Sequence, residues 1–136
     1  MLEPPPERHE VLIIDPDLSI AQYAALILEA AGYSVTIRMS CADVEARCTS
    51  QPEVAVIEVQ SFGERLEALP LWLAHYLPTA GVLLLSSHAE LPPTPLPEWI
   101  RRLPAEMPLT AEKLVACVAA SRTRASNSSA PKGLGM

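Results

Sequence analysis

The sequence predicts an α/β protein with a doubly wound sheet of five parallel strands, in which the fourth helix is shortened or replaced by a proline-rich segment. Three observations lead to this fold class. Short apolar runs alternate with segments of helical periodicity, and the links between them are short. The apolar runs lack polar alternation, which is typical of strands buried on both faces. Right-handed crossovers between successive strands then give a parallel sheet covered by helices on both sides.

The first strand and helix are predicted near the start of the chain. The run 11–14 (VLII) predicts a buried strand, and the apolar periodicity of 18–31 predicts an amphipathic helix. Asp17 or Ser19 can cap the start of this helix, and Gly32 can end it in a left-handed conformation. The side chains expected to face the sheet are Ile20, Ala24, Ile27, Leu28 and Ala31.

Three further strands and two helices are predicted over the middle of the chain. The strands are 33–38, 54–57 and 82–85, and the intervening helices are 40–49 and a segment within 64–77. A capping box with Asp in place of the usual Glu opens the first of these helices. Its residues are Ser40-Cys41-Ala42-Asp43.

The segment after the fourth strand is unusual because it holds four prolines in the six residues from Pro92 to Pro97. Prolines lack the backbone N–H and forbid a regular helix here, so at most a short turn is expected over 98–102. A weak fifth strand is predicted over 103–106. The last helix is predicted to begin at about Thr110 and to turn these residues inward: Leu114, Val115, Val118 and Ala119.

Composition limits the class of protein. The 136 residues carry a net charge of −6 and no basic block, which argues against direct nucleic-acid binding. The chain has no apolar run near the roughly 20 residues of a membrane span, and its N-terminus does not resemble a signal peptide. The three cysteines form no metal-binding pattern, so we expect reduced thiols and a cytoplasmic location. Residues 1–9 are predicted to be a flexible lead, 10–122 one domain, and 123–136 a flexible tail or linker.

Candidate site positions follow four of the predicted strands. Asp15-Pro16-Asp17, Glu58, Ser86 and Met107 all stand at carboxyl ends of strands. Because functional crevices of open α/β sheets lie beyond these ends, we expect the four positions to converge.

The predicted elements and these strand-end residues together resemble a response-regulator receiver domain, the chemotaxis-regulator-like (βα)5 module with flavodoxin-like topology. The resemblance covers about residues 10–122. Its segments are VLIIDPDLSI, LILEAAGYSV, VAVIEV, VLLLSSHAE and MPLTAEKL, in this order. It implies two-component signalling, in which an aspartate accepts a phosphoryl group beside a Mg²⁺ ion.

Most of the family's site positions are altered. Asp15 matches the first of two adjacent acids, but Pro16 replaces the second, and Asp17 is displaced by one residue. Glu58 stands at the phospho-acceptor position. The resemblance also places Ser86 at the hydroxyl position, Met107 at the lysine position and Pro108 at the following proline. These departures identify the chain with a degenerate pseudo-receiver subtype.

The chemistry of these departures argues against phosphotransfer. Proline offers no oxygen to Mg²⁺, and the extra methylene of Glu58 moves its carboxylate by about 1 Å, enough to slow a positioned reaction. Met107 supplies no cation to a phosphoryl oxygen. We therefore expect no enzymatic activity, no cofactor and no Mg²⁺ at the vestigial acidic pocket of Asp15, Asp17 and Glu58. Glu58 is open to two interpretations, a partial mimic of a phosphorylated aspartate or a solvated acid in a disused site.

The sequence thus predicts a non-catalytic pseudo-receiver that acts by protein–protein interaction in a two-component-type pathway. Its partner would be a kinase, a regulator or an output domain, and its oligomeric state is open. The expected interaction residues are Trp99, Pro95, Pro97, Arg101 and Arg102.

Two alternatives remain. The first is an atypical receiver that accepts a phosphoryl group from a histidine kinase on Glu58 or Asp17. The second is a flavodoxin-like cofactor binder, which is disfavoured because no phosphate-binding loop follows Ile14.

Overall fold

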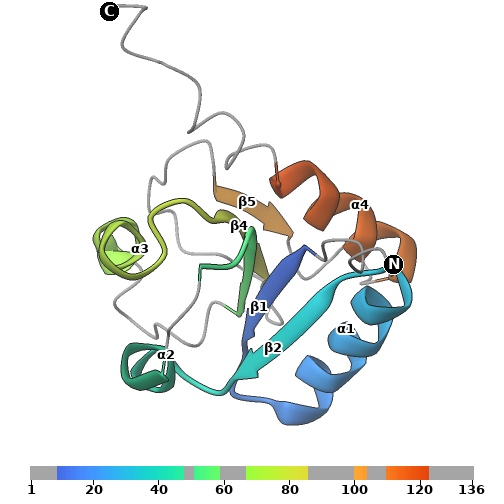
Figure 1. Ribbon diagram of the computed structural model, residues 1–136, viewed down its shortest axis with the longest axis horizontal. Coiled ribbons are helices and arrows are strands. Elements are labelled where there is room, and N and C mark those ends of the chain that lie inside the picture. Colours follow the sequence, from blue (N-terminus) through green and yellow to red (C-terminus); the bar gives the residue numbers. More distant parts are fainter. Residues whose placement is uncertain (1–8, 48–50, 59–66, 86–99, 104–109, 123–136) are drawn as a thin grey trace, which may run out of the picture.

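A computed structural model describes residues 9–47, 51–58, 67–85, 100–103 and 110–122 (Figure 1). Five parallel strands form one sheet in the order β2-β1-β3-β4-β5, which confirms the predicted fold class. The strands are β1 (Glu10–Ile14), β2 (Ser34–Arg38), β3 (Val54–Glu58), β4 (Gly81–Leu85) and β5 (Ile100–Leu103). The proline-rich segment that was predicted to replace the fourth helix lies outside the described residues.

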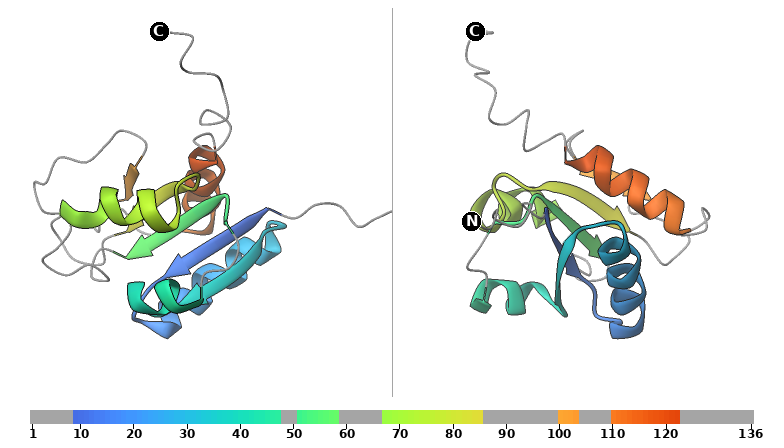
Figure 2. Two further views of the ribbon diagram at one scale, coloured as in Figure 1. Left: turned by 60° about the vertical axis from the view of Figure 1, so that its left-hand side comes forward. Right: turned by 45° about the vertical axis from the view of Figure 1, so that its right-hand side comes forward.

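Helices cover both faces of the sheet, as the right-hand view of Figure 2 shows. One face is covered by α1 (Leu18–Ala30) and α4 (Ala111–Ser121), and the other by α2 (Cys41–Arg47) and α3 (Leu69–Tyr76). Strand residues point alternately to the two faces, so β1 contributes Val11 and Ile13 to the first core and Leu12 and Ile14 to the second. The central strands β3 and β4 are buried along their whole length.

The predicted helix ends are confirmed at several positions. Asp17 caps α1, and Gly32 follows it with a φ of 100°, in the region where a side chain would be strained. The Ser40 hydroxyl accepts a hydrogen bond from the Asp43 backbone N–H, 3.1 Å away, at the start of α2. Thr110 caps α4 by accepting from the backbone N–H of Lys113 at 3.1 Å. These contacts satisfy N–H groups that have no partner within the helix.

The fifth strand is earlier than predicted. It occupies Ile100–Leu103 rather than 103–106, and it pairs with β4 in the register Val82↔Ile100 to Leu85↔Leu103. Ile100 is buried in the core beneath α2 and α3, which anchors this register. Pro104 has no N–H for a strand ladder, so the sequence itself explains why the strand precedes it.

The inward faces of two helices also differ in part from the prediction. Ala24 and Leu28 of α1 are buried as expected, but Ala31 is exposed and Ile20 and Ile27 are only half-buried. Small residues let α1 approach the sheet closely, and its buried set is Ala21, Ala24, Ala25 and Leu28.

In α4, Leu114 and Val118 face inward as expected, whereas Val115 is half-buried and Ala119 is exposed. Ser121 takes the next inward position. Its hydroxyl donates to the Cys117 carbonyl at 2.8 Å, which satisfies the buried polar atom.

Two close approaches hold the amino-terminal edge of the sheet. Gly81 lies against Ser121, and a Cβ at Gly81 would stand 1.8 Å from the Ser121 carbonyl oxygen. His9 contacts the Glu53 carboxylate through Nδ1 and the Arg122 guanidinium through Nε2, the latter at 2.8 Å. The His9 carbonyl also accepts from the Ser34 N–H at 2.9 Å. His9 is therefore bonded to the fold, although the sequence placed it in the flexible lead.

Candidate functional site

Two of the three acids predicted to converge, Asp15 and Glu58, stand at neighbouring positions at the carboxyl edge of the sheet. Asp15 follows Ile14, which is paired with Ile57 of β3, and Glu58 follows Ile57. Glu58 is in turn paired with Leu85 of β4. Strand alternation therefore places Asp15, Glu58 and Leu85 in one row, on the face that α1 and α4 cover.

Both acids are buried, with 3% of Asp15 and 5% of Glu58 exposed. The interpretation of Glu58 as a solvated acid is therefore wrong. Glu58 is the last residue of β3, a strand buried on both faces, and this packing removes its side chain from water.

The Asp15 carboxylate is held by the backbone around it. The Asp15 backbone N–H donates to the Arg38 carbonyl of β2 at 3.0 Å. The Asp15 Oδ1 accepts from the backbone N–H of Asp17 at 2.8 Å. Burial raises the pKa of Asp15, while the hydrogen bond from Asp17 opposes this shift. Burial thus favours the neutral carboxyl, the form least suited to binding a cation.

Asp17 has a different task from Asp15. Its Oδ1 accepts from the backbone N–H groups of Ser19 at 3.0 Å and Ile20 at 3.3 Å, and from the Ser19 hydroxyl at 2.7 Å. The hydrogen bond from the Ser19 side chain, followed by that from the Ile20 backbone, lowers the pKa of Asp17. Asp17 therefore serves as the helix cap and does not replace the second acid of the receiver pattern.

The donor set available to Mg²⁺ is incomplete in the part of the site that the structure describes. Asp15 and Glu58 are present, but Pro16 offers no side-chain oxygen. No group of three Asp, Glu, His or Cys side chains gathers closely enough within the described segments to hold a metal ion. The described part of the site thus offers two side-chain carboxylates, those of Asp15 and Glu58, to a cation.

Several predicted site residues lie outside the described residues. They are Ser86, Met107 and Pro108 of the switch positions, and Trp99, Pro95 and Pro97 of the predicted interaction surface. Arg101 and Arg102 belong to β5 rather than to a turn, and the Arg101 side chain is exposed.

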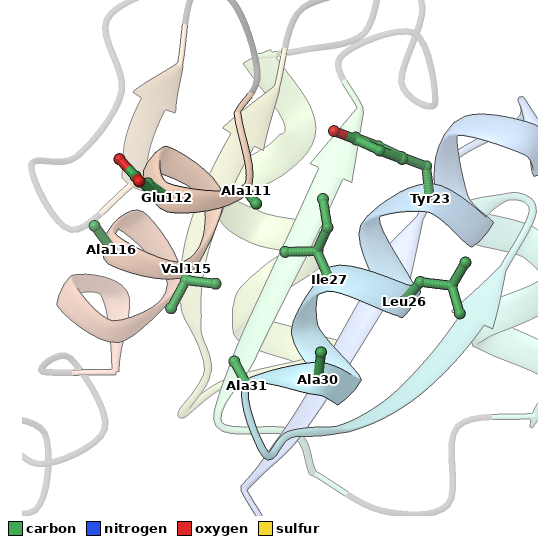
Figure 3. Close-up of a pocket in the computed structure, with 9 residues that line it drawn as sticks. All are labelled: Tyr23, Leu26, Ile27, Ala30, Ala31, Ala111, Glu112, Val115 and Ala116. Carbon is green, nitrogen blue, oxygen red and sulfur yellow. The ribbon is translucent and has the colours of Figure 1, made fainter.

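An apolar groove between α1 and α4 was missed by the sequence analysis (Figure 3). It has a volume of about 810 Å³. Ile27 and Val115 point into it from the two helices, while Tyr23 and Leu26 lie on the α1 side. The sequence did contain a signal of this groove. Glu29 is the single charged residue of α1, so the surface of this helix could be expected to have an apolar side.

Comparison with known proteins identifies the fold. No family model matches the sequence, and no curated protein matches it. The structure is similar to a CheY-like response regulator receiver domain protein from Methanospirillum hungatei, with a TM-score of 0.68, 16% identity and coverage of 90% of this chain and 99% of the other. It is similar to a response regulator receiver protein from Sinorhizobium medicae, with a TM-score of 0.69, 19% identity and coverage of 86% and 96%.

A third similar structure is an adenylate cyclase from Rhodopirellula baltica, with a TM-score of 0.70, 15% identity and coverage of 94% of this chain and 97% of the other. The fold is thus that of CheY-like receiver domains. None of the helices described here has the length and hydropathy of a membrane span.

Proposed function

We propose that this chain is a pseudo-receiver, a receiver-fold domain that acts in two-component-type signalling through protein contacts and without its own phosphorylation. The proposal rests on three features of the residues at the carboxyl edge of the sheet. Asp15 is buried and bonded to the Asp17 backbone, Pro16 replaces a metal ligand, and Asp17 is engaged as a helix cap.

Phosphoryl transfer to a carboxylate depends almost wholly on positioning and on neutralising charge. At this edge burial opposes the ionised form of Asp15, and Glu58 carries its carboxylate one methylene farther than an aspartate would. The sequence adds Met107 where a receiver has lysine. These three features oppose both Mg²⁺ binding and attack on a phosphodonor, while the receiver fold supports a signalling protein as partner.

The test is the intact mass of the protein after incubation with acetyl phosphate and Mg²⁺. We expect no added phosphate on the wild-type chain. The positive control is the triple variant Pro16→Asp/Glu58→Asp/Met107→Lys, which restores the receiver pattern and is expected to gain a phosphate under the same conditions.

A phosphate on the wild-type chain that disappears in Glu58→Ala or Asp17→Ala would instead establish the atypical phosphorylatable receiver. Circular dichroism of each variant shows whether it has folded. A magnesium titration followed by intrinsic fluorescence provides a second readout, in which tight binding by the wild-type chain would contradict the proposal.

A further inference from the structure

The outer edge of β2 carries backbone groups that point away from the sheet. The Ser34 N–H donates to the His9 carbonyl at 2.9 Å and so faces β1. Successive residues of a strand turn their backbone groups to opposite sides, so the N–H and C=O groups of Val35 and Ile37 point outward. In the part of the chain that the structure describes, the sheet ends at β2, and β1 is the strand paired with it.

The Arg38 side chain covers one of these outward groups. Its Nη1 donates to the Ile37 carbonyl at 3.1 Å, where the N–H of a neighbouring strand would donate in a longer sheet. The three residues before Arg38 are all β-branched, which favours strand pairing. Edges that resist pairing carry lysine, proline or a bulge, whereas the one charge of β2 stands at its last residue.

We infer that β2 pairs in antiparallel orientation with β2 of a second copy of this chain, about a twofold axis at Thr36. The twofold places Val35 opposite Ile37 of the second copy, and Ile37 opposite Val35 of the second copy. Each of these pairs exchanges both N–H···O=C bonds through the outward groups, and the two sheets become one. The inference goes beyond the proposed function, because it does not depend on the acids at the carboxyl edge.

Charge complementarity selects a second copy as the occupant of this edge. Glu10 of β1 is paired with Ser34 of β2, so their side chains stand in one row across the sheet. The twofold at Thr36 adds Arg38 of the second copy to this row, beyond the small Ser34. Glu10 is exposed, so that guanidinium can reach its carboxylate, and symmetry repeats the ion pair at the other end of the strands.

The test is sedimentation equilibrium of the full-length protein over a wide range of concentrations, without phosphodonor. We expect a monomer–dimer equilibrium. The net charge of −6 on each copy opposes association at long range. The salt concentration is therefore about 0.15 M, at which the Debye length is about 8 Å and the contacts at the strand edge decide the pairing.

Substitutions of Thr36 test the twofold, because this exposed side chain stands opposite its own copy. Thr36→Glu and Thr36→Lys each place like charges opposite one another, and each is expected to weaken the dimer about fivefold. The two changes shift the net charge in opposite directions, so a loss in both identifies the local contact. An equal mixture of the two variants is expected to dimerise again, because opposite charges then face each other.

The matched control is Leu71→Glu on α3, which adds the same charge at a side chain that is 79% exposed and lies away from β2 (Figure 1). It is expected to dimerise as wild type does. The register is tested by Glu10→Lys, which is expected to weaken the dimer, and by Glu10→Lys/Arg38→Glu, which exchanges the two charges and is expected to restore it. Circular dichroism shows whether each variant has folded.

Three outcomes would overturn the inference. They are a wild-type chain that stays monomeric over the whole range, a dimer that Thr36→Glu leaves unchanged, and a mixture of the two Thr36 variants that stays monomeric. A dimer that Leu26→Glu dissolves and Thr36→Glu does not would assign self-association to the groove between α1 and α4, and would equally exclude the β2 edge.

Discussion

Asp15 and Asp17 are two residues apart, yet the fold shifts their pKa values in opposite directions. Burial raises the pKa of Asp15, and hydrogen bonds from Ser19 and Ile20 lower that of Asp17. The sequence predicted both acids at the strand end and the cap role of Asp17. It could not predict the burial of Asp15 and Glu58, because burial depends on what packs around the end of the strand.

The raised pKa of Asp15 makes a prediction for stability. A group with a raised folded-state pKa stabilises the fold below its unfolded pKa, and this contribution is lost as pH rises through the folded pKa. In Asp15→Asn this loss is absent, since the amide does not titrate and its oxygen can still accept from the Asp17 N–H. The free energy of unfolding of the variant relative to wild type is therefore expected to rise with pH from about pH 4 upward.

Urea denaturation at several pH values measures this difference. Asp17→Asn is the matched control with the opposite sign, because a lowered pKa stabilises the fold above the unfolded pKa and the contribution is lost as pH falls. Parallel pH profiles of wild type and Asp15→Asn would contradict the prediction.

At the scale of elements, strands and caps were more predictable than helix faces. The buried strands of the sheet centre are continuous apolar runs, and Gly32 and Thr110 mark helix ends by local chemistry alone. The inward face of α1 was misjudged because the smallest residues, such as Ala21 and Ala25, take the positions closest to the sheet. The α1–α4 groove was missed for the same reason, since periodicity assigned its Ile27 to the core.

Glycine substitutions distinguish two roles at this scale. Gly81→Ala is expected to lower the free energy of unfolding by about 3 kcal/mol, because its Cβ meets the backbone of Ser121 and α4 must move away from β4. Gly32→Ala is expected to cost about 1 kcal/mol, since it meets no atom within 4 Å but keeps a φ of 100°.

Chemical denaturation of the two variants checks these values. Substitution of Gly32 by Asn, which tolerates the left-handed conformation, is expected to recover part of the loss, whereas no larger residue should recover stability at Gly81. Equal costs at the two glycines would show that the contact between β4 and Ser121 yields easily.

At the scale of the whole molecule, the contacts of His9 and Arg122 join the first and last described residues across Glu53. All three side chains are partly exposed, so the Arg122–Glu53 ion pair and the contacts of His9 are screened by water. A double-mutant cycle of His9→Ala and Arg122→Ala is expected to give a coupling energy of about 0.5 kcal/mol. A coupling indistinguishable from zero in low salt would show that the two ends are held by the backbone contacts alone.

This meeting of His9 with Arg122 has an architectural consequence. A folded unit whose two ends leave from one place can be spliced into a surface loop of a host protein without stretching either junction. The same closeness permits the two ends to be joined by a short linker of glycine and serine, with new ends opened in another loop. The order of the strands along the chain would then change, while the sheet itself would be kept.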